Sequence, residues 1–408
     1  FKVRASYGSL GNQNTSSLYP TYSTIGTGTG SWIIDGTLAN IAWAPSLVSY
    51  NLSWEKIRTW NAGVDFGLFN NRLTGSFDYY IRKTDDMVGP SEKLPVVLGT
   101  AVPSSNNTNL KTFGWELELM WKDRLNNGLN YSARFTLADS RTKITRYSNP
   151  SGLIDGFYAG KYVGEIWGYE TIGIAQSDQE MAEHIGRLIN GGQSNLGQDW
   201  KAGDIMYKDL NEDGKIDAGS RTLQDHGDLK RIGNSTPRYN VGLELAADWK
   251  GFDIRMFWQG TLKRDYFQGS YYFWGANGRQ GPWFSTALKG HDDYFRNDEA
   301  SPLGTNLNSY YPRPLFNTDK NQQSQTKYLQ DASYLRLKNL QIGYSLPHNI
   351  VQKMGMQHLR IFASGENLFT ITSLIDFFDP ESIEGGSWGH GNVYPLSRTF
   401  SFGLNVTF

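Results

Sequence analysis

The chain has 408 residues with a formal net charge of −1, and it contains no cysteine. The near-zero charge gives no indication of a nucleic-acid partner, and the lack of cysteine excludes disulfide bonds and thiolate metal sites. No stretch approaches the roughly 18 apolar residues of a membrane-spanning helix. The length suits one large β-structure.

Apolar and polar residues alternate from the first position of the chain. In "FKVRASYG", Phe1, Val3, Ala5 and Tyr7 share one parity, and basic or small polar residues take the other. This period of two is typical of a β-strand with one apolar face. Because the sequence opens inside such a pattern, we expect it to be part of a longer polypeptide.

The first complete hairpin is predicted between residues 60 and 82. Its apolar parity starts at Trp60 and returns through Phe77 to Ile81. Asn70 and Asn71 separate the two strands, and asparagine tolerates the positive φ that tight hairpin turns require. Further strands with the same alternation are predicted at 113–121, 129–137, 241–249, 252–258, 335–346, 359–369 and 400–408.

Two local irregularities are predicted within these later strands. Lys250 and Gly251 form a second tight turn. Leu335 and Leu337 have a parity opposite to that of the apolar residues after them, which predicts a β-bulge near Lys338 and Asn339. About ten strands result, and several approach the ~10 residues that cross a bilayer at a tilt.

Connection lengths alternate strictly between short and long. The short turns are predicted at 70–71, 122–127, 250–251 and 348–356, and the long connections at 9–56, 83–111, 141–235, 265–330 and 368–395. Short turns on one side and long loops on the other are the layout of an outer-membrane β-barrel. A soluble β-sandwich with long loops is the alternative, but it has no reason to segregate loop lengths in this way.

The distribution of side chains favours the barrel. Aromatic residues lie near strand ends, where the two membrane interfaces would be, as Trp60, Trp121 and Trp249 illustrate. The opposite parity carries charged residues such as Glu116 and Glu118, which suit a wet lumen and would be costly in a dry core. The sequence therefore predicts an all-β transmembrane antiparallel barrel with long extracellular loops.

One loop has the spacing of a calcium site. Hard cations prefer several oxygen ligands at close range, and "DLNEDGKIDAGS" wraps such ligands around one point. Ser220 stands where an EF-hand has a bidentate glutamate, which removes a charge. We expect structural Ca²⁺ or Mg²⁺ binding, and an Asx-rich turn without metal is the alternative. The predicted ligands are Asp209, Asn211, Asp213, Lys215 through its carbonyl, and Asp217.

Aromatic clusters in the long connections are candidates for contact with a ligand or partner. Flat rings flanked by glycine and amide residues suit sugar faces, peptides or a protein interface, although loops that pack on one another would look the same. The candidates are Tyr272, Trp274, Trp283 and Trp388. No catalytic motif with the HExxH, G-x-S-x-G or P-loop spacing is present, so we do not expect an enzyme.

Several segments together resemble the SusC/RagA-type TonB-dependent outer-membrane transporters of Bacteroidetes. The matching stretches are "KVRASYGSLGNQN" (2–14), "GWELEL" (114–119), "GYETIGIAQSDQE" (168–180), "GDIMYKDLNEDGKID" (203–217), "IGNSTPRYNVGL" (232–243), "ASYLRLKNLQIGYSLP" (332–347) and "LRIFASGENLFT" (359–370). They cover the chain in the family's order. Ser235 and Ser220 depart from the family's usual proline and aspartate, and the second departure weakens the metal prediction.

The resemblance implies a plug domain inside a 22-stranded barrel, of which residues 1–408 would be about the last ten strands, without plug or early strands. Residues 141–235 and 265–330 would be long extracellular loops. The implied function is import of oligosaccharides or peptides across the outer membrane, powered through TonB and assisted by a SusD-like lipoprotein. TonB would act through the missing N-terminal region. A surface glycan-binding or structural protein without active transport is the alternative.

Overall fold

A curved antiparallel sheet forms the centre of the computed structural model. The structure describes residues 1–13, 21–45, 47–89, 102–276, 278, 282–285, 287–316, 318–385, 391, 393–394 and 396–408. Ten strands pair in the order β1-β4-β5-β6-β7-β12-β13-β16-β17-β18. Their bounds are β1 (Lys2–Asn12), β4 (Glu55–Leu68), β5 (Leu73–Met87), β6 (Thr108–Arg124), β7 (Asn130–Arg146), β12 (Arg238–Trp249), β13 (Phe252–Lys263), β16 (Tyr334–Ser345), β17 (His358–Thr372) and β18 (Thr399–Thr407).

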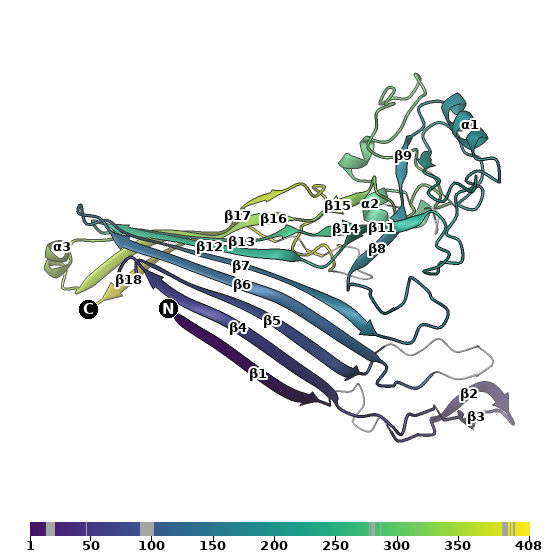
Figure 1. Cartoon of the computed structure of the whole chain (residues 1–408). Coiled ribbons are helices and arrows are strands. Elements are labelled where there is room, and N and C mark those ends of the chain that lie inside the picture. Colours follow the sequence, from purple (N-terminus) through teal and green to yellow (C-terminus); the bar gives the residue numbers. More distant parts are fainter. Residues whose placement is uncertain are drawn as a thin grey trace.

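Each strand of this sheet pairs with the sheet strand before and after it in the sequence, and β1 and β18 form the two edges. The short turns and both chain ends lie at one end of the wall, and the long connections lie at the other (Figure 1). Among the described residues no helix combines the length and apolarity needed to cross a bilayer. The predicted number of strands and the segregation of turns from long connections are confirmed.

The long connections contain small folded elements of their own. The described parts of residues 147–237, 264–333 and 373–385 pack together, and we call them the loop domain (Figure 1). Its elements are β8 (Glu165–Tyr169), β9 (Thr171–Ile174), α1 (Asp178–Arg187), β10 (Ile205–Tyr207), β11 (Leu229–Asn234), β14 (Asp265–Phe267), α2 (Tyr271–Trp274), η2 (Pro282–Phe284), η3 (Lys289–Asp292) and β15 (Leu329–Asp331). A hairpin of β2 (Thr27–Ile34) and β3 (Thr37–Ala42) and a short helix α3 (His348–Lys353) lie outside it.

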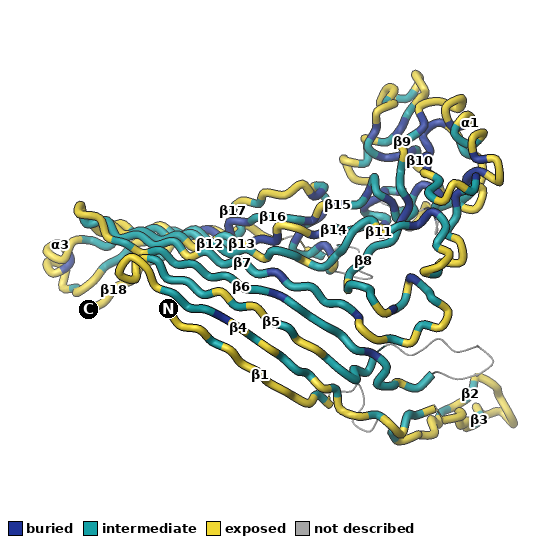
Figure 2. Tube along the Cα trace, in the orientation of Figure 1, coloured by how far each residue is buried: buried dark blue, intermediate teal, exposed yellow. Residues whose placement is uncertain are grey.

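The sheet has one apolar face and one polar face, set by the strand register. Phe77, Leu117, Leu137 and Val241 stand side by side on four neighbouring strands. This apolar face is not covered by protein in the described structure, since Phe77 is 39% exposed and Phe402 is 85% exposed. The main buried hydrophobic cluster lies in the loop domain (Figure 2). Apolar side chains on an open face are what a hydrocarbon solvent requires.

The predicted turns and bulge are confirmed. Asn70 and Asn71 have φ values of 56° and 63°, and Lys250 and Gly251 have 47° and 89°. Both turns thus use the left-handed region that type I′ hairpins need. The register between β16 and β17 shifts between Leu337 and Asn339, which is where the parity of the leucines changes.

The strands run further toward the long connections than predicted. β5 continues to Met87 and β7 to Arg146, where the alternation of apolar residues predicts loops from 83 and 141. The short turn predicted at 122–127 lies instead between Arg124 and Asn130. Alternation reports only the part of a strand that faces hydrocarbon, whereas backbone pairing continues beyond it with charged side chains.

The turn at Lys250 and Gly251 yields a first prediction. A Cβ on Gly251 would come within 2.7 Å of the Ser345 carbonyl oxygen, whereas a Cβ on Gly128, also at positive φ, would meet nothing within 4 Å. Gly128→Ala should therefore lower the free energy of unfolding only by the cost of a left-handed backbone at alanine, about 1–2 kcal/mol. Gly251→Ala should lower it more. Urea unfolding in detergent micelles measures both, and equal losses would contradict the close approach of β16.

Candidate functional site

Paired charges cover the polar face of the sheet. The Arg4 guanidinium donates to Asp65 at 2.8 and 2.9 Å and to Asp78 at 2.8 Å, so it bridges β4 and β5. Arg134 on β7 donates to both oxygens of Glu118 on β6 at 3.0 and 2.9 Å. These side chains stay partly exposed. Bidentate pairs across strands hold the charges in place on a wet surface without burying them.

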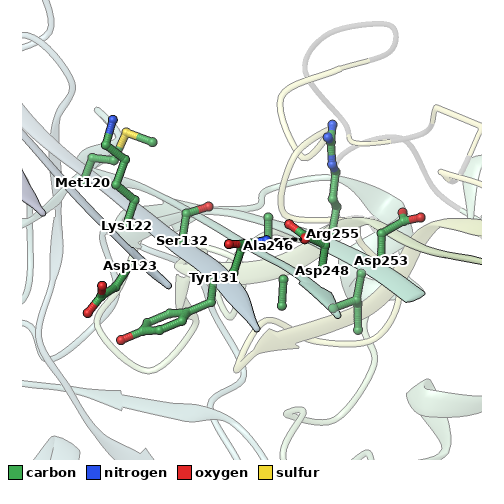
Figure 3. Close-up of a pocket in the computed structure, with 12 residues that line it drawn as sticks. Met120, Lys122, Asp123, Tyr131, Ser132, Ala246, Asp248, Asp253 and Arg255 are labelled. Atoms are coloured by element: carbon green, nitrogen blue, oxygen red, sulfur yellow. Dashed lines mark hydrogen bonds between the residues drawn. The ribbon is translucent and has the colours of Figure 1, made fainter. Parts of the chain in front are cut away.

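Two hollows lie along this wall. One of about 410 Å³ is lined by Asp78, Glu116 and Glu118 together with polar residues of β12 and β13. Another of about 430 Å³ lies near the short turns. There Lys122 and Arg255 point to one side of the sheet, and Tyr131 points to the other (Figure 3). The hollowed face offers donors, acceptors and both charges to a polar solute.

The loop domain also reaches onto the polar face. The guanidinium of Arg336 on β16, only 4% exposed, donates to Asp379 at 2.5 Å and to Glu381 at 2.7 Å. Lys338 donates to the same Glu381 at 3.1 Å. These contacts anchor the connection after β17 against the sheet. The position of the loop domain is therefore fixed by ionic contacts to the wall as well as by its own core.

An ionic cluster with a fully buried carboxylate joins two of the long connections. The Asp204 carboxylate, with no exposed surface, accepts from Arg313 at 2.7 Å, from Asn321 at 2.9 Å and from the nearly buried Lys320 at 2.9 Å. Burial by itself would raise the pKa of Asp204, but these donors outweigh it and hold that pKa below its usual value. Burial conversely lowers the pKa of Lys320.

An aromatic cluster forms much of the loop-domain core. Phe273, Trp274, Tyr311 and Tyr328 meet with ring centroids between 4.7 and 6.3 Å apart, mostly edge to face. Ser270 caps α2 by accepting from the Phe273 amide at 3.4 Å, which places this helix in the core. Tyr311 was not predicted, because its loop gives no apolar periodicity that would mark it as buried.

A cavity of about 350 Å³ adjoins this cluster. Its lining includes Trp274, Tyr311, His291 and Phe316. The indole nitrogen of Trp274 and the hydroxyl of Tyr311 are buried, and neither has a hydrogen-bond partner in the described structure. Burial raises the pKa of Tyr311 well above its usual value, so the hydroxyl stays a donor at neutral pH. Two unused donors beside an aromatic cavity could accommodate acceptor groups of a ligand.

The four aromatic candidates from the sequence do not gather in one place. Trp274 lies in the core and Tyr272 packs against it half-buried. Trp283 is 81% exposed. Trp388 lies outside the described residues. Trp283 is therefore the candidate best placed to meet a partner, whereas Trp274 serves packing and lines the cavity.

The predicted metal loop is held by its own hydrogen bonds. The Gly214 amide donates to Asp209 at 2.8 Å, the Asp213 amide to Asn211 at 3.2 Å, and the Lys215 amide to Asp213 at 3.1 Å. The Lys215 ammonium lies 2.6 Å from Asp217 and 3.7 Å from Asp213. It thus supplies the positive charge that a cation would bring.

The donor set of this loop fits a cation only in part. Among the described residues, one carboxylate oxygen of Asp209 is buried without a hydrogen-bond partner. No group of three or more His, Cys, Asp or Glu side chains in the described part of the chain is arranged to hold a metal ion. The Ca²⁺ or Mg²⁺ site therefore stays a prediction.

Comparison with known proteins agrees with this architecture. Residues 1–368 match the family model described as TonB dependent receptor-like, beta-barrel. The chain belongs to this family. It is 29% identical over its whole length to TonB-dependent receptor P3 of Formosa agariphila, and 27% identical over 89% of its length to TonB-dependent receptor SusC of Bacteroides thetaiotaomicron.

Solved structures show the same fold. The whole chain aligns with 40% of a chain in the structure of the RagAB peptide transporter, with a TM-score of 0.70 and 23% identity. The chain spans 39% of the P3 receptor and 33% of SusC. It is thus a segment of an outer-membrane β-barrel of the TonB-dependent receptor family, similar in sequence to SusC and in fold to the RagAB transporter chain.

The Asp204 cluster yields a second prediction. Asp204→Asn leaves Lys320 and Arg313 facing a neutral amide in a buried site, so it should destabilise the loop domain by about 3–5 kcal/mol. Limited proteolysis of the receptor in detergent, with fragments identified by mass spectrometry, measures the effect. Lys208→Gln, which breaks the more exposed Lys208–Glu170 pair at 3.1 Å, is the control and should cost less than about 1 kcal/mol. Equal protease resistance in both variants would contradict the assignment.

Proposed function

We propose that the chain forms the C-terminal part of a TonB-dependent importer of oligosaccharides or peptides. The observation that supports this most directly is a wall with an open apolar face, a hollowed and ionic opposite face, and the loop domain at the end with the long connections. Because the chain belongs to the TonB-dependent receptor family, the wall lies in the outer membrane. The polar face would line the path of the solute, and the chain itself would catalyse no reaction.

We assign the loop domain to capture of the substrate and contact with a second protein. A SusD-like surface lipoprotein is the proposed partner, because one relative is SusC and the matched fold is that of the RagAB peptide transporter. The exposed Trp283 and the cavity beside Trp274 support this role. Energy would come through TonB, bound by a part of the receptor that precedes these strands.

Gene deletion combined with de-energisation tests the proposal against the alternative of a surface glycan-binding protein. Cells that lack the receptor should fail to take up one class of oligosaccharide or peptide, and the gene in trans should restore uptake. A protonophore should abolish uptake in the complemented cells but leave surface binding of the labelled solute intact. If the deletion leaves uptake of every oligosaccharide and peptide unchanged, the importer assignment is wrong, and retained binding alone favours the alternative.

Two tryptophans separate the roles of surface and core. Trp283→Ala removes a ring that is 81% exposed, so it should weaken association with the lipoprotein or the solute severalfold at unchanged stability. Trp274→Ala empties a core position and should cost about 3–5 kcal/mol in loop-domain stability. Pull-down of the lipoprotein and thermal unfolding are the two readouts. If the Trp283→Ala variant binds the lipoprotein and the solute normally, Trp283 is not part of the contact surface.

We also propose that the loop at 209–220 binds Ca²⁺ when Lys215 swings out. Because the Lys215 ammonium competes for Asp217 and Asp213, Lys215→Met should raise the affinity for Ca²⁺, and Asp209→Asn should lower it. Calorimetric titration of the metal-free receptor with Ca²⁺ measures both. No heat of binding in the wild type and in Lys215→Met would show that the loop is an Asx turn only.

A further inference from the structure

Four basic side chains stand in one row on the apolar face of the sheet. Arg58 on β4 is paired in register with Lys83 on β5, Lys83 with Lys111 on β6, and Lys111 with Lys143 on β7. We call these residues the basic row. Strands lie about 4.8 Å apart, so the row spans roughly 14 Å of the surface. All four share the parity of the apolar residues further along their strands.

On β4, β5 and β6 the row follows directly on aromatic and aliphatic residues, whereas on β7 the next position on this face is Arg141. The next position on this face carries Tyr7, Trp60, Ile81 and Phe113, which are neighbours in register on β1, β4, β5 and β6. Aromatic side chains of barrels mark the level of the membrane interface. The basic row thus lies one step beyond that level, where lipid headgroups are, on the side of the long connections.

Arg58 is paired with Asp85, but the three lysines of the row have no ion pair among the described residues. Like charges directly opposite on neighbouring strands repel, yet no ion pair involves Lys83, Lys111 or Lys143 among the described residues. Asp85 is used by Arg58, and Asp86 by Lys56 and Arg146. No described residue therefore neutralises the three lysines, which leaves their charge for an added anion.

The three lysines differ in exposure, since Lys83 is exposed and Lys111 and Lys143 are half-buried. Lys83 is exposed, and its ammonium lies 5.4 Å from the ring centre of Trp60. Lys143 lies 5.6 Å from the ring of Tyr162 in the loop domain. Lys stems can rest on rings of this kind while the ammonium reaches the headgroup layer.

The row is confined to one part of the wall. At the corresponding ends of β13 and β17, the apolar face carries Leu262 and Ile371, which are 51% and 54% exposed. A general requirement for positive charge at the membrane surface would place cations there too. The concentration on β4 to β7 indicates a local site.

We propose that the basic row binds phosphate groups of lipid headgroups in the leaflet on the side of the long connections. The partner is a phosphorylated lipid because the cations share a face with the hydrocarbon-facing residues and lie at headgroup depth. Phosphate oxygens bridging neighbouring lysines would relieve the repulsion within the row. The bound lipid would also fix β4 to β7 in the bilayer next to the loop domain.

Native mass spectrometry of the full receptor in detergent tests this site. The probes are bis-phosphorylated lipid A, its enzymatically dephosphorylated form, and zwitterionic phosphatidylethanolamine. The triple variant Lys83→Gln, Lys111→Gln, Lys143→Gln should bind the bis-phosphorylated probe at least tenfold more weakly, and its Arg counterpart should bind like the wild type. Neither variant should change binding of the other two probes.

A matched control removes equal charge elsewhere. Lys122→Gln, Lys250→Gln, Lys353→Gln takes three cations from the end with the short turns and should bind the phosphorylated probe within twofold of the wild type. If both triple variants lose binding of the phosphorylated probe equally, the net charge of the protein explains the binding and the proposal is overturned. The proposal is also overturned if the row variant binds the phosphorylated lipid as tightly as the wild type does. The same holds if the row variant no longer binds an acidic polypeptide (polyglutamate) but still binds the lipid.

Thermal unfolding gives a second readout that does not need bound lipid to be counted. In lipid-free detergent the row variant should unfold at the same or a higher temperature than the wild type, because like charges are removed. The phosphorylated probe should raise the unfolding temperature of the wild type and not that of the row variant. An equal rise in both would overturn the assignment of the site to the basic row.

Discussion

Backbone hydrogen bonding is the constraint on which this structure depends. No water is available in hydrocarbon to satisfy amide and carbonyl groups, so a chain that crosses it in strands must pair them continuously. Ten strands do so here, each with its sequence neighbours in the sheet. Once pairing satisfies the backbone, each face is free to match its own solvent. The edges at β1 and β18 are where a barrel would continue in the other strands of the receptor.

The wall and the loop domain are stabilised by different means. On the wall, apolar side chains such as Phe77 remain uncovered, and the strands are held in place by their hydrogen-bonded pairing in register. The loop domain instead has a buried core in the manner of a soluble domain. Asp204 ties two connections together inside it, and Arg336 ties a third to the wall. The loop domain is thus stabilised by a core that does not depend on the apolar face of the strands.

Charge is arranged differently on the two faces of the sheet. On the polar face, Arg4 and Arg134 are each neutralised by carboxylates on neighbouring strands. On the apolar face, Lys83 and Lys111 stand opposite each other, and neither has an ion pair among the described residues. Paired charges leave the polar face close to neutral, whereas the three lysines keep positive charge on the apolar face. The same residue types therefore have different roles according to the solvent that they meet.

The sequence by itself determined the strands, the two faces, the tight turns at Asn70 and Lys250, and the bulge near Asn339. These features follow from local rules, since side-chain alternation and turn chemistry depend only on neighbours along the chain. The SusC/RagA resemblance also came from short segments of the sequence, and the family match confirms it.

Only the tertiary structure decided the contacts between distant segments. Trp274 and Trp283 are equivalent candidates in the sequence, and packing places one in a core and the other at the surface. The Asp204 cluster joins residues more than a hundred positions apart. The basic row arises because register aligns four cations from four strands. Such sites depend on which strands and loops lie next to one another in space, and the residue pattern within one segment does not predict this.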